Sequence, residues 1–498
     1  MLISRRGGLL AAVSGAAALV AGSASAETLA DAIALAYQTN PTLQAQRATL
    51  RQLDESWVQA RAGYRPTLTA TAQGNYEQTR INGRTTLADT NGDGVKEVVS
   101  NAITETNSAT GALTFSQPIW TGGRVGAAVS AAEADILAGR ENLRRTEATV
   151  LGTVIQAYVD VRRDQEALHI RENNVAVLTR QLEESKARFD VGEITRTDVA
   201  QSEARLAAAQ AQLQSSQAQL AISRAAYAAV VGQNPGDLAP EPSLASLLPN
   251  DPDAAFDLAE KNNPQIRAAE YAEQASRARL ASARAERMPT VSVQAKMAWV
   301  GAGDPFDTDR MYRDVTGAAA VTVPLFNGGL TTSRVRAAIE RNNADRLSVE
   351  SAKRSVLQNL TNAWSTLLST RANISSTDVQ VKAARIAAEG TRQEQQVGLR
   401  TTIDVLNAEQ ELRSAELSQV TARHDEYIAA ANLLSQMGRL EAAYLVPNAP
   451  RYDPKANFGK LRITWGWTPW EEPIAIVDGV LTPKTKELPR EQPPAAAK

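Results

Sequence analysis

Two stretches of the chain carry a helical pattern of unusual length. No proline lies between Gly123 and Asn234, or between Pro324 and Pro447. Apolar side chains recur there at intervals of seven: Leu168, Val175, Leu182 and Phe189; Leu206, Leu213, Leu220 and Tyr227; Ile374, Val381 and Ala388. A seven-residue period keeps one seam against a partner helix and produces a coiled coil. The length favours this interpretation over an ordinary amphipathic bundle, and a helix from Arg124 to Asp190 would extend roughly 100 Å.

Four short segments alternate between apolar and polar residues instead: 67–72, 113–116, 290–299 and 319–325. Runs of about ten residues with this period fit transmembrane barrel strands. A half-buried sheet of a soluble protein has the same period, so the pattern alone leaves both alternatives open. Four strands cannot close a barrel, and each unpaired backbone group in lipid costs several kcal/mol. If the strands span a membrane, three chains would have to pool twelve of them.

The chain also repeats itself. Pro41 and Pro66 recur as Pro264 and Pro289, displaced by 223 positions, and Pro118 recurs as Pro324, displaced by 206. The 17 residues of difference therefore fall between Pro66 and Pro118. A duplication of this length favours a structural role over a catalytic domain. We predict a first copy at residues 27–238 and a second at 239–445, each with a helix, a strand pair and a long helical hairpin.

The hairpin turns share one motif. Val191-Gly192 and Val397-Gly398 end one helix, and Thr195 or Thr197 in the first copy and Thr401 or Thr402 in the second can cap the next helix.

The N-terminus has the features of an export signal at residues 1–26. Arg5 and Arg6 precede an apolar run at residues 7–20, and small residues at 24–26 suit cleavage. The run is shorter than the ~20 residues of a membrane-spanning helix, which disfavours a single-pass anchor. The chain has no cysteine, so stability must come from packing and oligomerisation. A net charge of −2 argues against a nucleic-acid partner.

No cofactor or metal is expected. The two histidines, His169 and His424, lie in long helical patterns without a partner at ligand spacing, so we expect both on helix surfaces. The loop between the first two strands contains Asp89, Asn91 and Asp93 in the order that opens a calcium loop. Ser100 stands where its final glutamate belongs, and Lys96 replaces an apolar residue. A solvated, turn-rich loop is the favoured interpretation.

The repeats end near Pro447, and residues 446–498 form an extension. Its cluster of Trp465, Trp467 and Trp470 is most simply interpreted as a packing appendage, and we predict that the Pro/Ala-rich tail at 489–498 is disordered.

The chain resembles the TolC family of outer-membrane channel-tunnels in three features. These are the Gly-Gly turns, the Val-Gly-x-x-Thr-x-x-Asp hairpin tips and the Ala-Arg-Ala-Gly-Tyr-Arg-Pro-Thr-Leu run at residues 60–68. The resemblance covers residues 29–445. It implies a mainly helical homotrimer in which four strands per chain complete a twelve-stranded transmembrane β-barrel in outer-membrane lipid. A coiled-coil barrel of helices would continue it across the periplasm.

The resemblance also implies a gate at the hairpin tips. It places Thr197 and Asp198 on the first tip and Arg400, Asp404 and Asn407 on the second, with an Asp198–Arg400 contact between the tips. Three copies of Asp404 around an axis would attract cations. The sequence departs from the family pattern at Asn407, where a second acidic ring is usual, and at Gln395, where an aromatic tether is usual. Helix capping is a compatible role for Asp198 and Asp404.

The function implied is a passive exit duct for drugs or secreted proteins. An inner-membrane pump, driven by protons or by ATP, and a periplasmic adaptor would recruit it at the hairpin tips, through Val191, Gly192, Val397, Gly398 and Leu399. The rival interpretation is a soluble periplasmic coiled-coil adaptor or scaffold, which the alternating strands disfavour. No phosphate-binding loop, paired catalytic carboxylates or nucleophile–base arrangement points to an enzyme.

Overall fold

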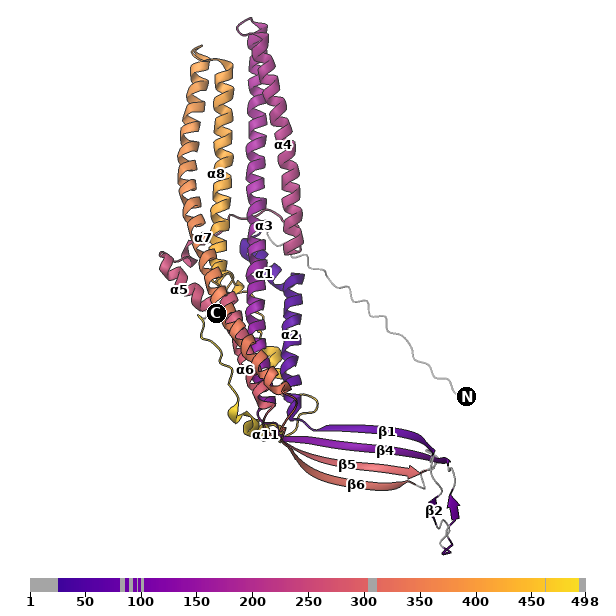
Figure 1. Ribbon diagram of the computed structural model, residues 1–498. Helices are drawn as coiled ribbons and strands as arrows, with labels where there is room; N and C mark the ends of the chain where they lie inside the picture. Colours follow the sequence, from indigo (N-terminus) through magenta and orange to yellow (C-terminus); the bar gives the residue numbers. More distant parts are fainter. Residues whose placement is uncertain are drawn as a thin grey trace, which may run out of the picture.

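The computed structural model describes residues 26–80, 86–88, 93–95, 97–99, 103–302, 311–461 and 463–491. A long bundle of helices stands on a narrow base, and a single sheet projects from that base (Figure 1). Among the described residues, no helix has both the length and the apolar character that crossing a membrane requires.

Each copy contributes two shorter helices, two long strands and a helical hairpin. The first copy contains α1 (Leu29–Thr39), α2 (Pro41–Arg61), β1 (Thr67–Arg80), β4 (Ile103–Trp120), α3 (Arg124–Asp190) and α4 (Arg196–Val231). The second contains α5 (Pro252–Asn262), α6 (Pro264–Ala285), β5 (Thr290–Ala302), β6 (Tyr312–Thr322), α7 (Leu330–Gln396) and α8 (Thr402–Gln436). Every one of these elements in the first copy thus has a counterpart in the second.

Short elements complete the chain. They are η1 (Ala62–Tyr64), β2 (Thr86–Ala88), β3 (Glu97–Val99), η2 (Ala245–Leu247), α9 (Ala442–Leu445), α10 (Ala456–Lys460), α11 (Glu471–Asp478) and η4 (Gly479–Leu481). The small β2–β3 hairpin lies in the loop that was expected to be solvated and turn-rich.

The two copies begin their helices in the same way. Asn40 accepts hydrogen bonds from the first backbone N–H groups of α2, and Asn263 does so for α6; a proline follows each. Gly123 and Gly329, both with φ 85°, precede α3 and α7. The expected helix from Arg124 to Asp190 is confirmed at its full length of 67 residues.

The coiled-coil seam is confirmed in the second copy, where Val381 and Ala388 of α7 are buried against Leu412 and Ala415 of α8. In α3 the seam is shifted. Leu178 is buried there, whereas Val175 is only half-buried beside it.

The long strands form one antiparallel sheet in the order β1-β4-β5-β6. All four predicted segments lie in or beside it, but the strands are longer than the alternation suggested. The prediction for residues 319–325 was wrong at its end, because β6 stops at Thr322. Pro324, which has no backbone N–H to donate to a neighbouring strand, follows two residues later. Pro118 lies within β4, where the register to β5 shifts between Pro118 and Trp120.

The largest hydrophobic cluster lies around the middle of the bundle, where α1, α3, α4, α5, α7 and α8 meet. Towards the tips, α7 packs along α8, α8 along α3, and α3 along α4. Towards the base, α6 takes the place of α8 between α7 and α3, and α2 takes the place of α4. The chain is therefore a curved layer of helices whose two lateral edges are α7 on one side and α4 with α2 on the other.

The C-terminal extension runs down along α2 and returns up along α6, and Lys455 of the descending part pairs with Glu487 of the returning part (2.8 Å). On α2, Asn457 donates a hydrogen bond to Asp54 (2.8 Å) and the Phe458 ring contacts Trp57. At the base, α11 lies between the helices and the sheet (Figure 1). The returning segment ends beside α5 and α6.

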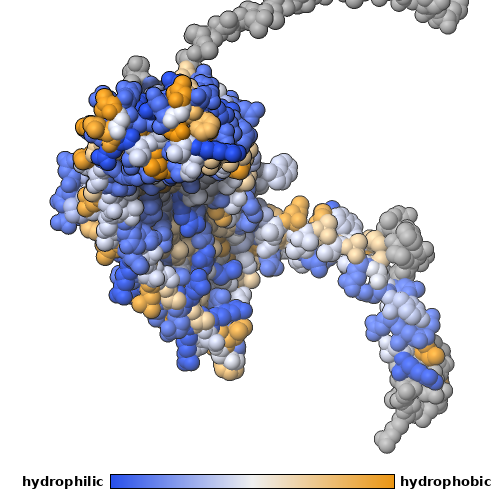
Figure 2. Space-filling view, turned by 90° about the horizontal axis from the view of Figure 1, so that it is seen from above, coloured by the Kyte–Doolittle hydropathy of each residue, from blue (hydrophilic) through white to orange (hydrophobic). Residues whose placement is uncertain are grey.

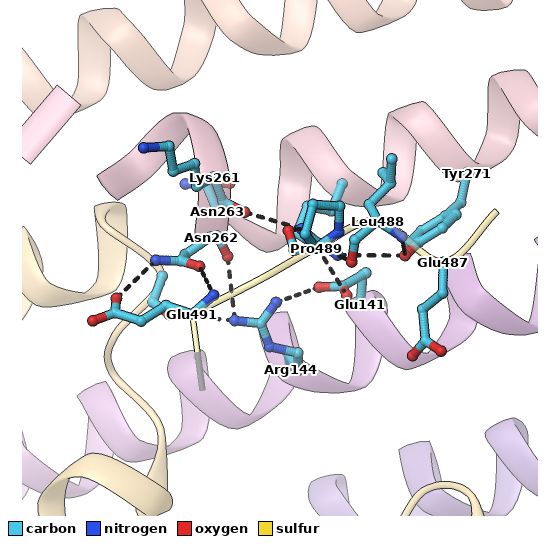
Figure 3. A network of polar contacts seen from close by, with 12 residues as sticks. Glu141, Arg144, Lys261, Asn262, Asn263, Tyr271, Glu487, Leu488, Pro489 and Glu491 are labelled. Atoms are coloured by element: carbon cyan, nitrogen blue, oxygen red, sulfur yellow. Dashed lines mark hydrogen bonds and ion pairs between the residues drawn. The ribbon is translucent and has the colours of Figure 1, made fainter. Parts of the chain in front are cut away.

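The returning segment is held by polar contacts (Figure 3). Arg267 donates to the carbonyl oxygens of Leu488 (2.7 Å) and Pro489 (2.9 Å), and Glu491 pairs with Arg439 (2.5 Å). The beginning of the tail that was predicted to be disordered, Pro489 to Glu491, is therefore bound to the second copy; residues 492–498 lie outside the described part.

Candidate functional site

The sheet has two chemically different faces. The register places Ala70 of β1, Leu113 of β4, Met297 of β5 and Val315 of β6 in one row, and the neighbouring row contains Leu68. Because successive side chains of a strand point to opposite sides, these rows form one apolar face.

The rows between them form a polar face. One of these rows contains Thr69, Thr114, Lys296 and Thr316, and the next contains Gln294. A sheet with this alternation needs an apolar medium on one side and an aqueous one on the other.

Neither face of the outer strands has a core in this chain. Every residue of β1 is exposed, and nearly every residue of β6 is too. These are also the two edge strands, so their outer backbone N–H and C=O groups have no neighbouring strand in the described sheet. The sheet is thus incomplete both across its edges and over its faces.

The hairpin tips at the opposite end of the molecule have the same turn in both copies. Gly192 (φ 78°) and Gly398 (φ 81°) adopt a left-handed conformation that closes each turn, and their N–H groups donate to Phe189 and Gln395. Val191 and Leu399 are 72% and 76% exposed. Figure 2, which looks down on the tips, shows hydrophobic patches among hydrophilic surface at this end.

The helices after the turns start with matching capping boxes. The Thr195 hydroxyl accepts the N–H of Asp198, whose carboxylate accepts the N–H of Thr195 (2.9 Å). Thr401 and Asp404 make the same contacts (3.1 Å). The capping role of both aspartates is therefore confirmed. Hydrogen bonds from Thr401, first its hydroxyl and then its N–H, lower the pKa of Asp404, so this exposed carboxyl is ionised at neutral pH.

The two tips have ion pairs of reversed polarity. Arg188 pairs with Glu193 (3.0 Å) at the first tip, whereas at the second tip Arg400 pairs with Glu394 (2.8 Å). The expected Asp198–Arg400 contact does not form within the chain, because each partner bonds inside its own hairpin.

One polar contact near the tips joins the two hairpins through a residue that the sequence analysis did not identify. Arg205 of α4 donates to Asn407 of α8 (3.0 Å) and also to Gln410. Arg205 lies seven residues after Asp198, two turns along the same helix face. That spacing was the sequence signal from which Arg205 could have been found.

Two other residues named in the sequence analysis lie at the tips. Thr197 is exposed in the first turn of α4, and the buried Gln395 donates to Thr402 in its own hairpin (3.4 Å).

His424 was wrongly predicted to be a surface residue. Its ring lies between α8 and α3, bonded through Nε2 to Asp160 (2.8 Å) and through Nδ1 to Asp425 (2.9 Å). Burial alone lowers the pKa of His424, but the hydrogen bonds to Asp160 and Asp425 outweigh burial and raise it above its usual value. The contact therefore joins the two copies more strongly when the ring is protonated.

Within the described ranges, no group of three or more His, Cys, Asp or Glu side chains could hold a metal ion. Of the three residues that suggested a calcium loop, Asp89 and Asn91 lie outside those ranges. Asp93 accepts a hydrogen bond from the N–H of Val95 (2.8 Å).

The chain matches the family model described as outer membrane efflux protein over residues 32–233 and 255–439. It is 32% identical over 442 residues to the outer membrane efflux protein BepC of Brucella suis biovar 1 (strain 1330), covering 89% of this chain and 92% of that protein. It is 26% identical over 317 residues to the alkaline protease secretion protein AprF of Pseudomonas aeruginosa, covering 63% and 66% respectively.

Among solved structures, the outer membrane protein VceC of Vibrio cholerae superposes with a TM-score of 0.66 at 21% identity, covering 82% of this chain and 96% of that one. The fold therefore matches that of an outer membrane protein.

Proposed function

The chain belongs to the outer membrane efflux protein family, and we propose that three copies of it form a gated channel-tunnel through which cargo leaves the cell. Members of this family are outer-membrane efflux channels, which are not enzymes, and they extend into the periplasm. Trimeric assembly, the gate and the partners are our proposals for this chain.

The two-faced sheet is the observation that carries the proposal. Lipid would cover the apolar face and water the polar face. This arrangement also requires every edge strand to be paired, because unpaired backbone groups are costly in lipid. β1 of one chain can pair with β6 of the next, because these are the two strands with free edges. Three chains then give twelve strands around one polar lumen.

The helical layer supports the same head-to-tail arrangement. Its edge helix α7 exposes a line of large apolar side chains, each between 52% and 73% exposed: Leu347, Leu357, Leu368, Val379 and Ile386. Their spacing of seven, ten or eleven residues keeps them on one side of the helix. We assign them to the contact with α2 and α4 of the neighbouring chain, so that sheet and helices close around the same axis.

The gate would lie at the periplasmic tips. In the assembled state Asp404, already ionised, would line the opening and attract cations. Thr197, Asp198, Arg400 and Asn407 would make the contacts that hold the tips together, and opening would require Arg205 to release Asn407. The exposed Val191 and Val397, with Gly192, Gly398 and Leu399, are the surface we assign to a periplasmic adaptor that recruits an inner-membrane pump.

The cargo class follows from the relatives only in outline. BepC is named for efflux and AprF for the secretion of a protease. The polar face, with Lys296 and Gln294 among threonines, would give a hydrated lumen without a binding site for one particular cargo. Such a lumen suits a channel whose cargo is selected by the pump.

The test is to extract the mature chain from outer membranes, fuse it to planar lipid bilayers and record single-channel conductance. We expect a trimer that needs detergent for extraction and conducts ions. A monomer that is soluble without detergent would contradict the proposal and would point to a periplasmic adaptor or scaffold.

A further inference from the structure

The C-terminal extension carries a second apolar surface that the channel itself does not require. Its members are 60% exposed or more and lie at the base of the bundle: Ile463, Trp465, Ile476, Val477 and Val480. We name this surface the collar patch. Trp467 and Trp470 lie beside it in the sequence and are 37% and 46% exposed. Three of the chain's seven tryptophans therefore fall within six residues at this place.

The backbone under the collar patch is fixed, although its side chains point into open space. Arg65, which directly precedes the proline before β1, donates to the Trp465 carbonyl oxygen (3.3 Å) and pairs with Glu471 (2.9 Å). Asp478, at the end of α11, accepts the N–H groups of Thr121 (2.6 Å) and Gly123 (3.0 Å) between β4 and α3. A packing appendage would bury its aromatic residues; here two buried carboxylates hold the segment, and the Trp465 side chain is fully exposed.

The extension beside the collar patch contacts the apolar side of the sheet. The Trp470 Nε1–H donates to the side chain of Gln117 in β4 (3.0 Å). Gln117 pairs with Val293 and therefore belongs to the same face as Leu113 and Met297. This contact places the extension against the foot of the apolar face, where α11 packs on β4.

Tryptophan and aliphatic side chains at the end of a membrane-spanning sheet suit the interface between headgroups and acyl chains, where aromatic rings gather. The exposed Lys460 and Lys484 flank the patch in the sequence, and cations beside apolar side chains favour an anionic lipid surface. We propose that the collar patch inserts into the periplasmic leaflet of the outer membrane. This inference rests on the proposed function, because it requires the sheet to span that membrane.

The arrangement would couple the membrane surface to the middle of the bundle. From the collar patch the chain runs back to Tyr271, whose hydroxyl oxygen accepts the N–H of Leu488 (2.9 Å), and to Asn262, which bonds Glu491 (Figure 3). The extension therefore connects the leaflet to α5 and α6 of the second copy.

The absence of cysteine allows a direct test, since each introduced thiol is unique. The full mature chain with Trp465→Cys or Ile476→Cys would carry a nitroxide label in vesicles of phosphatidylethanolamine and phosphatidylglycerol. Collision rates with lipid-soluble oxygen and with a water-soluble nickel chelate would then be measured. Two controls bracket the result: Val191→Cys at the hairpin tip, in water, and Val315→Cys on the apolar face of the sheet, in lipid.

We expect the oxygen-to-nickel ratio at residues 465 and 476 to be several-fold above that at 191 and below that at 315. A ratio at 465 equal to that at 191, with 315 in lipid, would overturn the collar and leave the channel intact. Shielding of 465 from both reagents would show that another protein segment covers the patch, which also overturns it. Water exposure at 315 would instead contradict the proposed function itself.

Discussion

The two places where a strand passes into a long helix have nearly the same backbone but opposite surroundings. Gly122 and Gly328 have φ values of 69° and 64°, and each is followed by a glycine with φ 85°. The first junction is covered by the C-terminal extension, with Asp478 buried on it. At the second junction, Leu325 and Phe326 are 91% and 90% exposed.

The long helices above the junctions differ in the same direction. α3 buries 25 residues, whereas α7, of equal length, buries 12. Local sequence therefore determines the turn in both copies, while distant segments decide whether it is covered. The first junction is completed within its own chain. The second is the one we expect a neighbouring chain to complete.

The largest effect should come from breaking the first junction. Glu471 is fully buried and pairs with Arg61 (2.6 Å) and Arg65 (2.9 Å). Glu471→Gln removes the buried negative charge that pairs with the guanidinium groups of Arg61 and Arg65. This change should cost about 3–5 kcal/mol of folding free energy. The matched control is Glu472→Gln, because Glu472 also pairs with Arg61 but is half-exposed; it should cost at most about 1 kcal/mol. Urea unfolding followed by circular dichroism measures both, and equal midpoints would contradict the account.

A pH-dependent difference between the copies follows from Glu147, whose counterpart in α7 is Lys353. Burial, followed by the charge of Glu441, raises the pKa of Glu147 from 4.5 to about 7. Because the folded protein holds Glu147 in its protonated form, this residue contributes stability that is fully present below pH 4.5. That contribution is lost as the pH rises through about 7. Glu147→Gln should therefore add on the order of 3 kcal/mol at pH 8 and little at pH 4.

Unfolding titrations of both proteins between pH 4 and pH 8 test this expectation. An identical slope in wild type and Glu147→Gln would show that Glu147 does not ionise in this range.

The equivalent glycines of the two junctions offer the closest comparison. A Cβ on Gly122 would lie 2.5 Å from Met288 Cβ, whereas a Cβ on Gly328 meets nothing within 4 Å. Both alanine variants carry the left-handed strain of about 1–2 kcal/mol, and Gly122→Ala should add about 1–3 kcal/mol for the clash. Thermal unfolding of the two variants measures the gap. A Gly328→Ala variant as unstable as Gly122→Ala would mean that a neighbour packs onto the second junction equally tightly.

The smallest effect on stability, and the most specific effect on function, concerns the tips. Asp198 and Asp404 occupy the third helical position of identical capping boxes, so either alanine variant should cost about 0.3–1 kcal/mol. Asp404→Ala should in addition lower cation selectivity in planar bilayers, because only Asp404 is assigned to the ring around the opening. Equal selectivity in the two variants would remove Asp404 as a filter.

Much of the fold follows from the sequence because its strongest signals are local. Proline-free heptads predicted α3 at full length and a long helix in the place of α7, and alternation located all four long strands. The tip motif left two candidate threonines for each helix cap, and the structure has Thr195 and Thr401 in that role. The small β2–β3 hairpin and the true end of β6 were missed, since short strands and strand ends depend on pairing partners more than on residue type.

The long-range polar contacts could not be predicted. Arg205 bonds a residue 202 positions away, His424 one 264 positions away, and Arg65 one 406 positions away. No local pattern distinguishes these side chains from solvated ones on a helix surface. The same limitation explains the Trp465 cluster, because composition indicated an appendage but not which side chains would stay exposed.

The central claim is that β6 of one chain pairs with β1 of the next in a ring that closes at three. Because the chain has no cysteine, it can be tested with Thr316→Cys on the polar face of β6. This change would be combined in turn with a cysteine at each of several alternate polar-face positions of β1: Thr67, Thr69, Thr71, Gln73 and Asn75.

The account predicts that one pair, or two adjacent pairs, will form intermolecular disulfides whose ladder on a non-reducing gel stops at three chains. The single variants should form none, since a head-to-tail contact never places identical residues together. A ladder that ends at two chains or continues past three, or the absence of cross-links for every pair, would contradict the closed trimeric sheet.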